Sequence, residues 1–169
     1  MTVAAVDQGA VAAESDGPAG GSTTANGVDP FGGGTFVTRA RTVTEADVAA
    51  FCALTGDWHP QHSDAEWAKA SIFTERVAHG LLVISIAVGL VPMDYDRLVA
   101  LRRIEGIFSL PVRLGETIHV EGRVVKAKEL EDGYALVSLV WRIVNQDGDI
   151  VARAHLKILW RGEHQAEAA

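Results

Sequence analysis

Two side chains in a short polar segment have the types and spacing that acid–base chemistry needs. Asp57 and His62 lie five residues apart within Gly56–Asp64, which is rich in loop-forming residues. Histidine takes up and returns a proton near neutral pH, and a nearby carboxylate can orient the ring or share a water molecule with it. His79 and Gly80 then open an apolar stretch. Because the first amides of a helix are unpaired and electropositive, the Gly80 N–H can polarise a substrate carbonyl.

Each of these residues also has a purely structural interpretation. Asp57 and His62 are common in turns and helix caps, and Gly80 can serve only to let a helix begin, so spacing alone leaves both interpretations open. His79 is interpreted as a helix-entry residue held by backbone groups, with a third acid–base role as the alternative. His59 and His62 have a spacing that suits zinc, but they flank a proline and lack an obvious third ligand. We therefore expect no metal.

Helix signals flank the polar segment on both sides. Thr44 is a good N-cap, and the apolar face that follows predicts a helix that ends near Gly56. Pro60 disfavours helical geometry at the residue before it, which predicts a structured loop there. Asp64 can cap a further short helix. Residues Gly80–Leu90 are apolar on every side, which predicts a helix that other structure must wrap.

The second half of the chain alternates with the period of two that is typical of half-buried antiparallel strands. Turn-forming residues at 131–133 and 146–148 predict hairpins. Strands are expected at Phe36–Arg41, Arg102–Leu110, Glu116–Lys126, Tyr134–Val144 and Ile150–Trp160. The predicted order is a strand, helices, one fully buried helix and a four-strand meander. An antiparallel β-sheet wrapped around a central apolar α-helix satisfies this order, which is the hot-dog architecture of the α+β class.

Composition limits the class of protein further. A length of 169 residues predicts one folded domain, and a net charge of −7 argues against nucleic-acid binding. The longest apolar stretch, Leu81–Val91, is too short to cross a membrane. The single cysteine, Cys52, excludes an internal disulfide and fits the cytoplasm. Residues 1–34 hold eight of the 17 glycines and no Lys or Arg, which predicts a flexible tail before a domain at 35–162; residues 163–169 are expected to form a C-terminal tail.

Three separated motifs occur between residues 36 and 161: Thr-Gly-Asp-Trp-His-Pro-Gln-His-Ser-Asp, Val-Ala-His-Gly-Leu-Leu and Phe-Ser-Leu-Pro-Val-Arg-Leu-Gly-Glu-Thr-Ile. In this order they resemble the MaoC-like dehydratase family, the group of (R)-specific enoyl-CoA hydratases with a hot-dog fold. The family pattern Gly-Asp-x-Asn-Pro-x-His implies that Asp57 and His62 are catalytic, and the Ala-His-Gly segment implies an oxyanion-hole amide at Gly80. His59 stands where the family has Asn. It is interpreted as an accommodated loop variant, with tuning of the neighbouring carboxylate as the alternative.

The resemblance implies a lyase that interconverts 2-enoyl and (R)-3-hydroxyacyl thioesters of coenzyme A or acyl-carrier protein, without a cofactor. A hot-dog acyl-thioesterase is the first alternative, although such enzymes typically lack the Asp-x4-His loop, and a non-catalytic acyl-binding subunit is the second. A homodimer or higher homo-oligomer is also expected, because a lone curled sheet has open edges and covers its helix on one side only.

Overall fold

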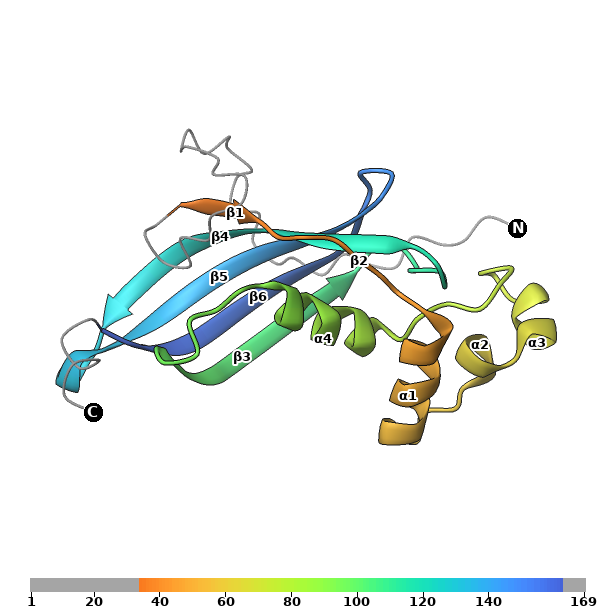
Figure 1. The fold of residues 1–169 in the computed structure, drawn as a ribbon, viewed down its shortest axis with the longest axis horizontal. Coiled ribbons are helices and arrows are strands. Elements are labelled where there is room, and N and C mark those ends of the chain that lie inside the picture. The colour runs from red at the N-terminus through yellow and green to blue at the C-terminus, as the bar shows by residue number, and fades with distance from the viewer. Residues whose placement is uncertain (1–33, 163–169) are drawn as a thin grey trace.

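The computed structural model describes residues 34–162, in which a curved antiparallel sheet lies over one central helix (Figure 1). This arrangement confirms the predicted α+β hot-dog fold. The expected tail at 1–34, apart from Gly34, and the expected tail at 163–169 lie outside the described residues. The helices are α1 (Glu45–Thr55), α2 (Pro60–Ser63), α3 (Ala65–Lys69) and α4 (Gly80–Leu90). The strands are β1 (Thr35–Val37), β2 (Arg41–Thr42), β3 (Leu98–Phe108), β4 (Thr117–Glu129), β5 (Tyr134–Asn145) and β6 (Ile150–Arg161).

The strand order corrects one prediction. The sheet runs β1-β4-β5-β6-β3, with β2 also paired to β4, so β4, β5 and β6 form a meander but β3 lies beyond β6. The predicted four-strand meander is therefore wrong, because a period of two fixes which face a residue occupies and not which strand lies alongside. Strand β3 also begins at Leu98, four residues before the predicted start, and most of its residues are exposed. An edge strand of this kind shows no clear alternation.

The predicted helix caps form as expected. Thr44 and Asp47 make a reciprocal capping box at the start of α1, and Gly56 ends this helix in the left-handed conformation with φ of 79°. Asp64 accepts hydrogen bonds from two amides of α3 through Oδ1. The loop predicted around Pro60 is only partly correct, because Pro60 is the first residue of the short helix α2. Proline suits this position, since its fixed φ is helical and its missing N–H is not needed there.

Helix α4 lies along the concave face of the sheet, with the short helices α1, α2 and α3 at one end of it (Figure 1). Its buried residues pack against the sheet in a core that includes the fully buried Trp141 of β5. The helix is not fully buried, because Leu81 is 67% exposed and Ser85, one turn further, is exposed too. This agrees with the expectation that the sheet covers its helix on one side only, and the described elements leave this strip of α4 uncovered. Among the described helices, none has both the length and the apolar character that crossing a membrane requires.

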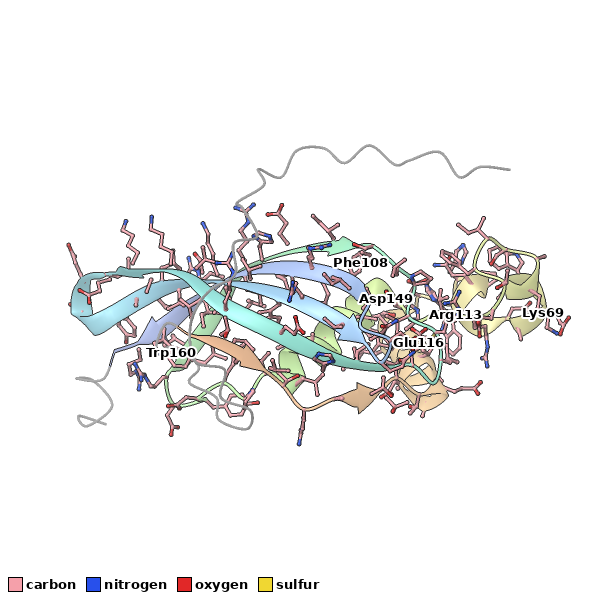
Figure 2. The ribbon with its side chains drawn as sticks, turned by 90° about the horizontal axis from the view of Figure 1, so that it is seen from above. Lys69, Phe108, Arg113, Glu116, Asp149 and Trp160 are labelled. Carbon is pink, nitrogen blue, oxygen red and sulfur yellow. The ribbon has the colours of Figure 1, made fainter. Side chains whose placement is uncertain are left out.

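Figure 2 shows the sheet from above, with Phe108, Arg113 and Glu116 near the end that carries the short helices. Trp160 lies toward the opposite end. The residues that follow β3 therefore reach the region where the polar segment of the sequence lies.

Candidate active site

The end of α1 positions Asp57. The Gly56 N–H donates to the Cys52 carbonyl at 2.8 Å, and the left-handed turn at Gly56 directs the chain out of the helix. The Asp57 N–H then donates to Thr55 Oγ1 at 3.2 Å. The Asp57 side chain is 54% exposed, and Oδ1 accepts a hydrogen bond from the His59 N–H at 3.3 Å. The carboxylate is thus at the surface of the fold, where a ligand can reach it.

His59 caps the helix that carries His62. Its Nδ1 accepts from the Gln61 N–H at 3.2 Å, which satisfies one of the free amides at the start of α2. Its ring contacts the Trp67 ring edge to face, with centroids 5.3 Å apart. An asparagine side chain can supply the same acceptor, so the histidine fits the position that shapes the loop.

His62 is buried, and its hydrogen bonds fix its tautomer. Nδ1 lies 2.7 Å from the Val77 carbonyl oxygen, which can only accept, so Nδ1 carries the proton. The lone pair is therefore on Nε2, where the Gln61 side-chain amide donates to it at 3.0 Å. Burial lowers the pKa of His62 below its ordinary value, although the Val77 carbonyl opposes the shift by favouring the protonated ring. A neutral imidazole with its lone pair on Nε2 is the form that can accept a proton.

His79 joins the loop to the start of α4. Its side chain is 3% exposed, and Nε2 lies 3.1 Å from the backbone carbonyl oxygen of Asp57. Its ring stacks on the ring of His62, with centroids 3.7 Å apart. The Cys52 thiol is 3.7 Å from Nε2, and burial raises the pKa of this thiol, so Cys52 is a poor nucleophile.

Gly80 is the first residue of α4, and its N–H has no acceptor within the helix. A Cβ at this position would lie 2.8 Å from two carbons of the Phe108 ring, so a side chain here would force that ring to move. The close packing of Phe108 on Gly80 brings the end of β3 against the helix start.

These residues surround a cavity of about 440 Å³. Asp57, His62, His79 and Gly80 all line it, so four of the five candidate residues meet in one place, whereas His59, which is exposed and caps α2, does not line it. Gln61 also lines the cavity, and apolar residues from several segments complete the lining, among them Phe51, Phe73, Phe108, Val112 and Val151. A hollow of about 520 Å³ at Arg102, Leu130, Lys157 and their neighbours contains none of the candidate residues.

Three side chains of the site are of the kinds that bind metal ions in proteins. Asp57, His62 and His79 each offer one ligand atom within 4.8 Å of the others, whereas His59, paired with His62 in the zinc hypothesis from the sequence, is not in this set. A carboxylate and two imidazoles are ligands that zinc accepts. Nδ1 of His62 and Nε2 of His79 are both engaged with backbone carbonyls, which leaves the lone pairs of these two rings on His62 Nε2 and His79 Nδ1. The separation of the groups also suits a single water molecule held between Asp57 and His62.

Sequence reasoning missed three contributors to the site. The Val77 carbonyl, which sets the tautomer of His62, is a backbone group and has no signature in the sequence. Gln61 was hidden in a variable position of the motif, although its place next to His62 was a usable signal. Phe108 reaches Gly80 only because β3 ends there, which depends on the strand order.

A family model described as a MaoC like domain matches residues 31–139 of the chain. The chain belongs to the MaoC-like family. Among curated relatives, the mitochondrial 3-hydroxyacyl-(acyl-carrier-protein) dehydratase FERN of Solanum lycopersicum is 30% identical over 118 residues, 70% of each chain. The (R)-specific enoyl-CoA hydratase of Aeromonas caviae is 31% identical over 61% of this chain and 75% of its own length.

Solved structures agree with this membership. A monoamine oxidase regulatory protein from Archaeoglobus superposes with a TM-score of 0.73 at 34% identity, over 77% of this chain and 90% of that one. The family resemblance seen in the three motifs is therefore confirmed, and so is the hot-dog fold of MaoC-like proteins.

Proposed function

We propose that this MaoC-like protein is a hydratase or dehydratase that interconverts 2-enoyl and (R)-3-hydroxyacyl thioesters. The observation that carries the proposal is the pair Asp57 and His62: both line one cavity, each offers a ligand atom within 4.8 Å of the other, and the buried His62 ring has its lone pair on Nε2. The names of the relatives from Solanum and Aeromonas support the same class of reaction.

Hydration in this site begins with a water molecule held between Asp57 and His62. The water takes the place of the Gln61 amide at His62 Nε2, and Nε2 then takes one proton from the water as its oxygen forms a bond to C3 of the enoyl group. Electron density moves onto the thioester oxygen, where the Gly80 N–H stabilises the developing negative charge. The proton returns to C2 by way of the Asp57–His62 pair, so that one water is added in total. Dehydration is the same sequence in reverse. The two groups act together, and the proposal assigns the proton transfers to them jointly.

We also propose that the working unit is a homodimer or a higher homo-oligomer. Strand β3 pairs with β6 on one side and, among the described residues, with no strand on the other. Leu101, Ile104 and Ile107 on this free edge are each 40–49% exposed, as expected for a strand that pairs with a second copy. Light scattering at micromolar concentration should give a mass of at least twice 18.0 kDa; a fully active monomer contradicts the proposal.

Hydration of crotonyl-CoA, followed by the loss of enoyl thioester absorbance, tests the function. The variants Asp57→Asn and His62→Gln keep the size and hydrogen-bonding reach of each side chain but remove its acid–base chemistry. Each should lower kcat by about 100-fold or more while the melting temperature stays close to that of the wild type. Free thiol is measured in parallel. Release of coenzyme A without hydration would identify a thioesterase, and near-native hydration in either variant would refute the assigned roles.

A further inference from the structure

His79 contacts both members of the Asp57–His62 pair and also directly precedes Gly80. Its ring lies 3.7 Å from the ring of His62, with the two planes inclined by 25°. Its Nε2 is within hydrogen-bonding distance of the backbone carbonyl of Asp57, 22 residues away in the chain. One buried side chain therefore touches the loop, the base and the helix start.

The direction of the His79 hydrogen bond follows from its partner. A carbonyl oxygen can only accept, so Nε2 of His79 must carry the proton. Nδ1 of His79 is buried and has no hydrogen-bond partner among the described residues. With the proton on Nε2, the unpartnered atom is a lone pair. His62 has the opposite tautomer, with its proton on Nδ1, so the two stacked rings have different hydrogen-bonding roles.

The Asp57 carboxylate has few restraints of its own. Its side chain is about half exposed, Oδ1 accepts a long hydrogen bond of 3.3 Å from the His59 N–H, and Oδ2 lies 3.9 Å from His79 Nε2, beyond hydrogen-bonding distance. The backbone of Asp57 is held more firmly, since its N–H donates to Thr55 and its carbonyl accepts from His79. The bond from His79 is the one that ties this backbone to the stacked pair of rings.

We propose that His79 is a positioning residue: its Nε2–H fixes the Asp57 backbone so that the carboxylate faces His62, while its ring supports the His62 ring. The proposal deepens the proposed hydratase function and rests on it. His79 acts through Asp57 and His62, so its loss should slow the chemical step and leave thioester binding largely intact.

Two substitutions separate the hydrogen bond from the stacked ring. In His79→Gln, the amide Nε2 lies the same number of bonds from Cβ as the imidazole Nε2, so the donor is kept and the ring is lost. In His79→Phe, a flat ring is kept and the donor is lost. We expect His79→Phe to lower kcat by about 10- to 100-fold at nearly unchanged KM, and His79→Gln to recover most of that loss. His119→Gln, on β4, is the matched control. Equal kcat in His79→Phe and wild type, or no recovery in His79→Gln, would overturn the proposal.

The histidine tautomers of the wild type can be measured without the reaction and without any variant. Long-range ¹H–¹⁵N correlation spectra of the wild type, labelled at histidine, should show the Nε2–H tautomer for His79 and the Nδ1–H tautomer for His62. Amide hydrogen exchange of residues 56–59 should quicken in His79→Phe and not in His79→Gln. An Nδ1–H tautomer at His79 overturns the proposal. If the wild type hydrates no enoyl thioester but the tautomers and the exchange are as expected, the proposed function fails while the positioning of Asp57 by His79 stands.

Discussion

Removing the N–H of Gly80 is the most direct test of the oxyanion role, and the structure shows that one substitution can do it. Gly80 is the first residue of α4, where proline is well tolerated because the N–H is not used by the helix. His79 before it has φ of −62° and ψ of 137°, the extended conformation that a residue preceding proline prefers. Gly80→Pro should therefore delete one N–H and leave the helix in place.

The Phe108 ring would clash with the new side chain, because any Cβ at Gly80 would lie 2.8 Å from the Cε1 and Cζ atoms of this ring. Ordinary van der Waals contact begins at 3.4 Å, so the ring would have to move by about 0.6 Å or more. Phe108 is 49% exposed, and its truncation to alanine removes the clash at a modest cost in stability. In the Phe108→Ala background, Gly80→Ala and Gly80→Pro both add a Cβ, but only the proline removes the N–H.

Loss of a single oxyanion-hole donor typically lowers kcat by about 100- to 1000-fold, which corresponds to about 2.7–4 kcal/mol. We expect this difference between Gly80→Pro and Gly80→Ala, both in the Phe108→Ala background, in the crotonyl-CoA hydration assay. Thermal unfolding followed by circular dichroism should give similar melting temperatures for the two proteins. If their kcat values agree within about threefold at equal stability, the Gly80 amide does not stabilise the oxyanion and the reasoning from the helix start is wrong.

Three further predictions concern pH, the loop and the core. Burial lowers the pKa of His62, and its neutral form is the base. A pH–rate profile should therefore show kcat/KM falling only when the pH drops below the ordinary histidine pKa of about 6.5. Stability should change in the same direction, since the unfolded chain binds the His62 proton more readily, and urea unfolding should become easier below about pH 6.5. His59→Asn keeps an acceptor for the α2 amide and should retain activity and melting temperature; a loss of activity alone would assign His59 a direct role. Gly122→Ala places a Cβ 2.2 Å from the buried Phe36 ring and should lower the free energy of unfolding by about 1–3 kcal/mol in chemical denaturation, whereas Gly89→Ala, with open space around its Cβ, should not.

Local signals in the sequence predicted the elements well. Thr44 and Asp64 cap helices because the side-chain oxygen and the free amides lie within a few residues of each other, so the interaction is local. The alternating strands β4, β5 and β6 follow for the same reason, since short turns join them into neighbours. The pair Asp57 and His62 was also accessible, because both residues lie in one short segment.

The predictions that failed depend on contacts between distant segments. The place of β3 beside β6 follows from how the chain crosses the sheet after Phe108, which no local pattern encodes. An uncovered side of α4 was expected, but its place at Leu81 was not, because an all-apolar sequence shows that a helix needs cover and does not show which of its residues the chain itself covers. The bond from His79 to the Asp57 carbonyl involves a backbone acceptor, and any residue at position 57 would present the same acceptor.

The origin of the cavity walls has a consequence for how this protein can be varied. The groups assigned to the reaction all come from residues 57–80, while a second part of the lining comes from residues 108–112 and from Val151 and Ala152. This part of the cavity lining is thus encoded apart from the groups assigned to the reaction. Libraries restricted to positions 109–112 can search for longer or branched acyl groups while the Asp57–His62 pair is inherited unchanged. Natural substitutions at positions 109–112 would leave the Asp57–His62 pair unchanged in the same way. Close homologues with one chemistry can therefore come to differ in the acyl chains they accept.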